Sequence, residues 1–116
     1  MKNQYREALD RARKEGKLVL VNFTGYACTN CHWMKANMFP RPEIFAQAKD
    51  MVLVELYTDG ADRSSEENST LEETKFQTFT TPLYVLLDAN EKEIARFAGS
   101  TRDAAEFLKF LKARPA

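Results

Sequence analysis

Two cysteines, Cys28 and Cys31, are separated by two residues and directly follow an apolar run, Leu18–Phe23, and a short turn. A helical pattern, His32–Met38, comes directly after them. A C-x-x-C pair in the order strand, turn, cysteines and helix is typical of a thiol–disulfide redox site and not of a metal site. The sequence therefore predicts that the two sulfur atoms form and break a disulfide bond.

The position of Cys28 at the start of a helix predicts a reactive thiolate. Unpaired N–H groups and the helix dipole at that end favour an anion. Such a position lowers the pKa of a cysteine from ~8.5 to roughly 3.5–7.5. Cys31 follows one turn later on the same helix face, close enough to close a disulfide. We therefore expect Cys28 to be the nucleophile.

The chain length and composition indicate one ordinary domain over residues 1–116. Lys plus Arg and Asp plus Glu both number 17, so the net charge is zero, which does not favour nucleic acid or anionic membrane as a partner. No apolar run approaches the ~20 residues of a membrane span, and Met1–Gln4 begins no signal peptide. We expect a cytosolic protein, or a piece of a longer exported chain.

Apolar periodicity and turn residues predict a mixed α/β architecture. The expected helices are residues 3–15, 29–38, 42–49 and 70–77, and a last one that Thr101 or Ser100 caps. Residues 58–69 have no apolar period and are expected to form a solvated loop. The expected strands are residues 18–23, 51–57, 83–87 and 92–97, the first pair parallel and the last pair an antiparallel hairpin.

The stretch Val19–Cys31, the later Pro82–Asp88 and the dipeptide Thr81-Pro82 resemble the thioredoxin-fold family. They are most similar to the C-terminal periplasmic domains of the bacterial thiol–disulfide interchange protein DsbD and related thioredoxin-like proteins. The resemblance covers roughly Tyr5–Leu111. It implies a thioredoxin-like α/β fold with a mixed four-stranded sheet in the order 2-1-3-4, helices on both faces and an extra N-terminal helix.

The resemblance also implies dithiol–disulfide exchange, in which Cys28 attacks and Cys31 resolves the mixed disulfide. It implies a cis peptide bond at Thr81–Pro82, packed against the disulfide, with the backbone nearby docking partner proteins. No bound cofactor and no metal are expected, because the cysteines are themselves the redox centre. The residues expected to support the site or to dock partners are Tyr26, Ala27, Thr29, Asn30, Thr81 and Pro82.

The expected partners are proteins that carry a disulfide or a dithiol, and the resemblance allows a transmembrane protein as electron donor. It implies the role of a disulfide reductase in the periplasm or another extracytoplasmic compartment. The sequence itself leaves a cytoplasmic location open, and it does not set the direction of electron flow.

Three departures from the family pattern concern the chemistry of the site. Ala27 stands where thioredoxins carry a tryptophan, Asn22 where the family usually has a buried aspartate, and Lys35 where the DsbD-like domains often carry a glutamate. Both proton-handling acids are therefore absent. A carboxylate at either position would raise the pKa of a nearby thiol, whereas an amide does not and a lysine favours the thiolate. We therefore expect Asn22, Lys35 and the neighbouring His32 to influence the thiol pKa.

Two other classes of function remain open at this point. The run Cys28–His32 is also C-x-x-C-H, the attachment motif of c-type haem, with His32 as the proximal ligand of an electron carrier. The chain could instead be a non-catalytic binding module with an incidental cysteine pair. A zinc site needs about four ligands, which two cysteines and one histidine do not supply.

Overall fold

The computed structural model describes residues 1–114. Its centre is a four-stranded sheet in the order β2-β1-β3-β4. The pair β1–β2 is parallel, while β1–β3 and β3–β4 are antiparallel, so the predicted order and directions are confirmed. The strands are β1 (Val19–Thr24), β2 (Val52–Tyr57), β3 (Leu83–Leu87) and β4 (Glu93–Ala98).

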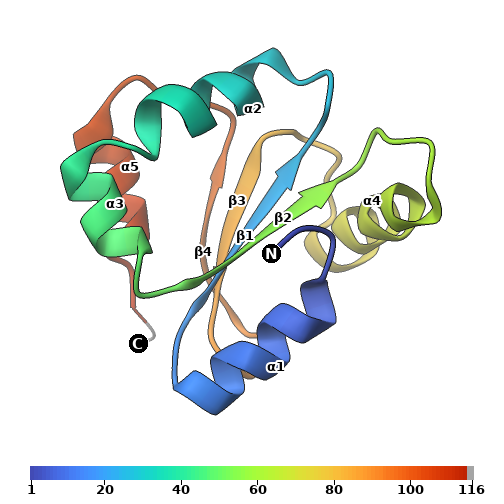
Figure 1. Cartoon of the computed structure of the whole chain (residues 1–116), viewed down its shortest axis with the longest axis horizontal. Coiled ribbons are helices and arrows are strands. Elements are labelled where there is room, and N and C mark those ends of the chain that lie inside the picture. Colours follow the sequence, from blue (N-terminus) through green and yellow to red (C-terminus); the bar gives the residue numbers. More distant parts are fainter. Residues whose placement is uncertain (115–116) are drawn as a thin grey trace.

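Helices cover both faces of this sheet (Figure 1). One face packs against α1 (Tyr5–Glu15) and α4 (Arg63–Phe76). The other face packs against the redox helix with its continuation, and against α3 and α5. These elements are α2 (Thr29–Trp33), the π-helix η1 (Met34–Met38), α3 (Pro42–Ala48) and α5 (Ala104–Leu111). None of the helices in residues 1–114 is long and apolar enough to cross a lipid bilayer.

The strand that leads to the cysteines is fully buried. Val19, Val21 and Phe23 of β1 point to the α1–α4 face, and Leu20 points to the α2–α5 face. Apart from Asn22 and Thr24, the buried side chains of β1 are apolar on both sides, which is typical of a strand in the middle of a sheet covered by helices. This packing fixes the end of β1 and therefore the turn that begins the active site.

The helix after the cysteines changes its winding at Met34. The N–H of Phe39 donates to the carbonyl of Met34 over 3.0 Å, a five-residue step that defines a π-helix. The predicted end near Met38 is confirmed, since Pro40 follows and cannot continue the helix. The sequence did not predict the wider winding.

The prediction of a loop at residues 58–69 is wrong, because α4 already begins at Arg63. The Asp62 carboxylate caps it by accepting the N–H of Ser65. The buried face of α4 consists of Ser65, Asn68 and Glu72, with Phe76 at its end. A pattern of apolar residues cannot reveal this part of α4, because most of its buried side chains are polar.

Two predicted helix starts also need correction. Asp103, and neither Thr101 nor Ser100, caps α5, since its carboxylate accepts the N–H groups of Ala105 and Glu106. Aspartate caps a helix at least as well as serine or threonine.

At the N-terminus, α1 begins at Tyr5 and not at Asn3. Asn3 instead lies along β2, where its N–H donates to the carbonyl of Glu55 and its side-chain oxygen accepts the N–H of Tyr57. The first residues therefore cover the exposed edge of β2, a type of edge that would otherwise be open to pairing with another chain.

Candidate active site

Cys28 and Cys31 form a disulfide at the junction of β1 and α2, with their Cα atoms 5.2 Å apart. Cys28 is the N-cap of α2, as its predicted place at the helix start required, and its Sγ accepts the N–H of Cys31 at 3.2 Å. Cys31 is buried, whereas Cys28 is partly exposed. A partner can therefore reach the first sulfur, while the second lies behind it.

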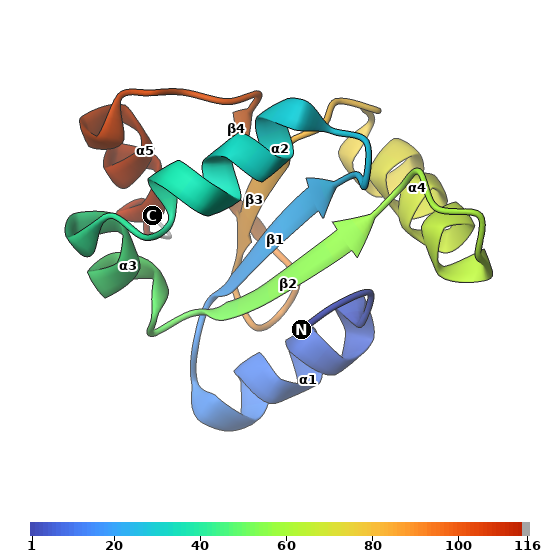
Figure 2. The same cartoon turned by 45° about the horizontal axis from the view of Figure 1, so that its top comes forward.

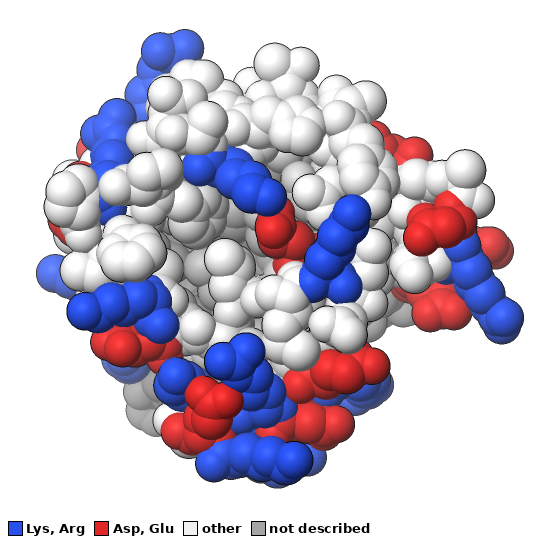
Figure 3. Space-filling model, in the orientation of Figure 1, with Lys and Arg blue, Asp and Glu red and all other residues white. Residues whose placement is uncertain are grey.

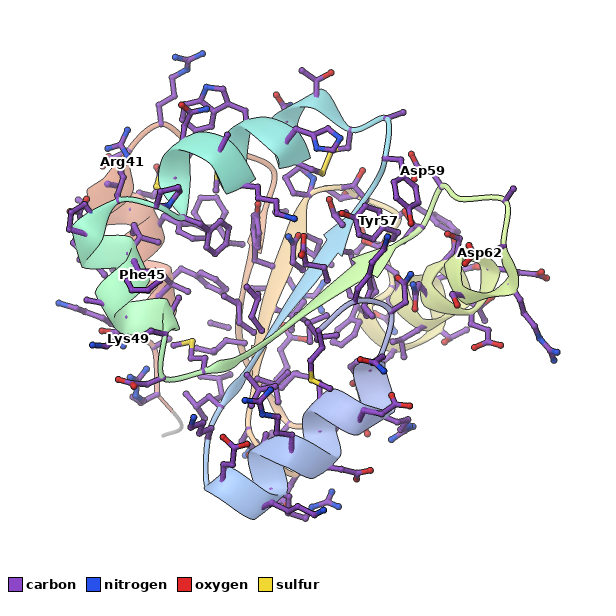
Figure 4. All side chains as sticks on the ribbon, viewed as in Figure 1. Arg41, Phe45, Lys49, Tyr57, Asp59 and Asp62 are labelled. Carbon is purple, nitrogen blue, oxygen red and sulfur yellow. A yellow bond between two sulfur atoms is a disulfide. The ribbon has the colours of Figure 1, made fainter. Side chains whose placement is uncertain are left out.

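The turn before Cys28 is held by a residue that the sequence analysis missed. Asp59, in the loop after β2, accepts the N–H of Tyr26 at 2.8 Å and the N–H of Ala27 at 3.0 Å (Figure 4). These two hydrogen bonds hold the pKa of Asp59 below its usual value. A Cβ on Gly25 would lie 2.9 Å from the Asp59 carboxylate, so only glycine allows this approach. The sequence could have indicated this contact, because β1 and β2 are expected to be parallel. Parallel neighbours end side by side, which brings the loop after β2 next to the turn after β1.

Tyr26 lies in this turn as an exposed aromatic side chain. Its ring stacks on Tyr57 of β2 with the centroids 4.1 Å apart, and it remains 49% exposed. The ammonium of Lys2 lies 5.0 Å from the Tyr26 centroid and 4.9 Å from the Tyr57 centroid, within the range of cation–π attraction. The N-terminal segment therefore also supports the redox turn.

The three residues expected to tune the thiol pKa lie in different surroundings. The Nε2 atom of His32 is 2.7 Å from the carbonyl oxygen of Tyr26, which ties α2 to the redox turn. Asn22 is buried in β1, and its Oδ1 finds no hydrogen-bond partner within residues 1–114. Lys35 pairs with Glu55 of β2, with Nζ and Oε2 3.2 Å apart. Only His32 therefore contacts the turn, and the Lys35 charge is shared with a carboxylate.

The expected docking residues gather at the same end of the sheet. The peptide bond between Thr81 and Pro82 is cis, and Pro82 is buried at the start of β3. Leu83 lies opposite Phe23, so this segment and the cysteines share one end of the molecule. Ala27, Thr29 and Asn30 are exposed around the disulfide. Figure 3 shows that charged side chains gather over α1, whereas the surface over α2 is largely uncharged.

A cleft of about 350 Å³ lies on the other side of the disulfide, between α2 and the loop from β4 to α5. The guanidinium of Arg102 lies over the ring of Trp33 in this cleft, 5.0 Å from the centroid. Sequence reasoning treated this loop only as a helix cap, because nothing local indicates that it meets α2. We call it the Arg102 cleft, and its lining residues are Thr29, Asn30, Trp33, Ser100, Thr101 and Arg102.

Known structures share this architecture. A solution structure of a thioredoxin from Thermus thermophilus matches with a TM-score of 0.75 and 28% identity, over 93% of this chain and 81% of that chain. The reduced C-terminal domain of DsbD from Neisseria meningitidis matches with a TM-score of 0.78 and 19% identity, over 97% of both chains. A putative disulphide-isomerase from Bacteroides thetaiotaomicron matches with a TM-score of 0.71 and 21% identity, over 97% of this chain and 88% of that chain. The last two likenesses show the fold alone.

A comparison with curated proteins finds no match for the sequence. The model of the thioredoxin-like domain family, in contrast, matches residues 5–115, which is nearly the whole chain. The resemblance that the C-x-x-C context and Thr81-Pro82 indicated is therefore confirmed, and this chain belongs to the thioredoxin-like domain family.

Proposed function

We propose that this protein is a thiol–disulfide oxidoreductase that exchanges electrons between its Cys28–Cys31 pair and disulfides of partner proteins. One observation carries the proposal: an accessible sulfur caps a helix in front of a buried sulfur to which it is bonded. A disulfide across four residues closes too small a loop to add much stability, so reactivity explains the pair better.

The exchange proceeds in two balanced steps. In the reduced protein the Cys28 thiolate attacks one sulfur of a partner disulfide, and the other partner sulfur leaves as a thiolate that takes up a proton. Cys31 then loses its proton and attacks Cys28 Sγ, and the second partner sulfur leaves and is protonated. The partner gains two electrons and two protons, and the protein acquires its Cys28–Cys31 disulfide.

The site favours Cys28 as the attacking atom. The N–H of Cys31 points at Cys28 Sγ, so the same contact would stabilise a thiolate there. Asn22 carries no charge, so no carboxylate at that position opposes the thiolate. His32 is tied to the same turn through the carbonyl oxygen of Tyr26.

We propose further that the protein works as a reductase outside the cytoplasm and receives its electrons from a membrane-embedded donor. The support is the similarity to the DsbD C-terminal domain of Neisseria meningitidis, which has been solved in an oxidised and a reduced form. The equilibrium redox potential tests the direction. A value near −270 mV supports a reductase, and a value near −120 mV contradicts it.

Trapping experiments test the assignment of the two sulfurs. Cys31→Ser should accumulate mixed disulfides through Cys28 on a non-reducing gel, and Cys28→Ser should not. The wild type should reduce a model protein disulfide in the presence of dithiothreitol. Failure to reduce any disulfide would favour the non-catalytic binding module, and alkylation of Cys31 before Cys28 would reverse the assignment.

No observation favours the c-type haem carrier. Haem attachment would need both cysteine sulfurs as thioethers, and here they are bonded to each other. Absorption of the purified protein near the Soret band would contradict this conclusion.

A further inference from the structure

We propose that the Arg102 cleft binds partner segments that carry a carboxylate close to the reactive cysteine, and that Arg102 selects them. The inference rests on the proposed function, because the cleft acquires this role from its place beside the disulfide. It adds a preference among partners: acidic segments should react faster than neutral or basic ones.

The position of the cleft places it in the path of a docking partner. Two of its lining residues, Thr29 and Asn30, are the residues between the cysteines. The opposite wall is the β4–α5 loop, which runs alongside α2 in Figure 2. This loop begins at Gly99, whose N–H donates to the carbonyl of Pro82 over 2.8 Å. A segment whose sulfur meets Cys28 therefore lies against the cleft.

The charge of Arg102 is not neutralised by the residues around it. Within residues 1–114 its guanidinium forms no ion pair, whereas Arg96 holds Glu93 at 2.7 Å. The two acids nearest in the chain accept hydrogen bonds from other groups and form no ion pair with Arg102 within residues 1–114. Asp103 caps α5, and Glu106 accepts the hydroxyl of Thr101 at 3.2 Å. A carboxylate brought into the cleft would therefore meet an available cation.

The cleft also holds that cation in place before a partner arrives. The Trp33 ring supports the guanidinium from one face, which leaves the N–H groups at its edge free to donate. A guanidinium presents a planar fork that matches the two oxygens of a carboxylate. A volume of about 350 Å³ is enough for a side chain and its neighbouring backbone. Thr29 and Ser100, whose side chains carry hydroxyls, also line the cleft.

The Arg102 guanidinium lies on one side of the disulfide only, which gives a bound segment a direction. Arg102 follows β4 and Asp59 follows β2, and these are the two edge strands of the sheet. A carboxylate is attracted to the Arg102 cleft, whereas on the other side the Asp59 carboxylate and the Lys2 ammonium lie together beside the redox turn. We therefore expect the preference to depend on which side of the partner cysteine the acid occupies.

Peptide disulfides test the preference. A series would place Glu one to three residues before or after the cysteine, and each peptide would have a twin with Gln. The wild type should reduce the Glu peptide about three- to ten-fold faster than its twin at one or two positions, and added salt should shrink this ratio. Arg102→Gln should bring the ratio to about one, and Arg102→Glu should invert it. Arg13→Gln, on α1 at the far end of the molecule, removes the same charge and should leave the ratio unchanged (Figure 1).

The outcomes separate this inference from the proposed function. Equal rates for every Glu and Gln pair in the wild type would overturn the Arg102 assignment and leave the oxidoreductase intact. A preference that persists in Arg102→Gln, with native far-ultraviolet circular dichroism, would also overturn it. If the wild type reduces neither peptide nor protein disulfides, the proposed function fails and the inference fails with it.

Discussion

The helices α4 and α5 each follow a loop that borders the redox turn, one on either side, yet they are held to the sheet by different chemistry. The buried face of α5 is apolar and consists of Phe107, Phe110 and Leu111. That of α4 consists of Ser65, Asn68 and Glu72, with one phenylalanine at its end.

The apolar contacts of α5 mainly give stability, whereas the hydrogen bonds of α4 position a loop of the active site. The ring of Phe107 lies 5.1 to 5.4 Å from the rings of Tyr84, Phe39 and Phe97, and such packing tolerates some change in direction. The polar contacts of α4 are directional. Ser65 accepts the N–H of Gly60 at 2.9 Å, next to Asp59, whose carboxylate holds the redox turn. Apolar burial therefore fixes α5 strongly, while hydrogen bonds of α4 set the geometry of the active-site loop.

The largest expected effect is on the α5 side. Phe107→Ala should lower the free energy of unfolding by about 3–5 kcal/mol, because it removes a fully buried ring and leaves a cavity. Urea denaturation measures the change. Phe45→Ala, which truncates a ring that is 60% exposed on α3, is the matched control and should cost about 0.5 kcal/mol or less. Similar losses in the two variants would contradict the role given to α5.

A smaller loss is expected from the α4 side. Asn68 donates to the carbonyl of Tyr57 and to the side-chain oxygen of Asn3, both over 2.9 Å. Asn68→Ala should therefore lower the free energy of unfolding by about 1–3 kcal/mol, since the Tyr57 carbonyl loses this donor and the Asn3 oxygen keeps only the N–H of Tyr57. Asn37→Ala, at an exposed amide on η1, is the control. A loss no larger than in the control would show that water replaces the amide easily.

Glu72 makes the stability of α4 depend on pH. Burial raises its pKa from 4.5 to about 7, and its Oε2 has no hydrogen-bond partner within residues 1–114. Between these two pH values the folded protein binds more protons than the unfolded chain, so the free energy of unfolding should fall as pH rises from about 4.5 to 7. We expect a decrease on the order of 1 kcal/mol.

Denaturation at several pH values measures this slope. Glu72→Gln keeps the shape of the side chain without its charge, and it should flatten the slope and be more stable than the wild type at pH values above about 7. The exposed Glu73→Gln should leave the slope as it is. A slope that survives in Glu72→Gln would mean that another group titrates in this range.

The same contrast explains how far the sequence could predict the fold. The strands, α5 and the place of Cys28 at a helix start follow from local patterns of apolar residues and turn residues. The start of α4 could not be found in this way, because its buried face is polar. Its stabilising contacts also join residues distant in the chain, such as Asn68 and Asn3.

The residues of the candidate site also fall into two groups, those that local sequence patterns indicate and those that only long-range contacts bring to the site. The cysteine pair and Thr81-Pro82 are recognisable from the sequence because neighbours in the chain form them. Asp59 is 33 residues from Tyr26, and Arg102 meets Trp33 from the opposite edge of the sheet. The pairing of Lys35 with Glu55 joins η1 to β2 across 20 residues of the chain. Such contacts arise only once the strand order is set, so no local pattern in the chain indicates them.

The smallest expected effect concerns the charge that α4 helps to place. Asp59→Asn removes a negative charge beside the redox turn and leaves one oxygen to accept two N–H groups. The pKa of the Cys28 thiol in the reduced protein should fall by up to about half a unit, because a like charge no longer opposes the thiolate. The shift stays small because solvent and salt screen an exposed carboxylate. Thiolate absorbance in the ultraviolet measures it, and hydrogen exchange at Tyr26 and Ala27 should quicken in parallel. Glu66→Gln, an exposed acid on α4, should change neither quantity. A higher thiol pKa in Asp59→Asn would mean that the shape of the turn matters more to Cys28 than the charge beside it.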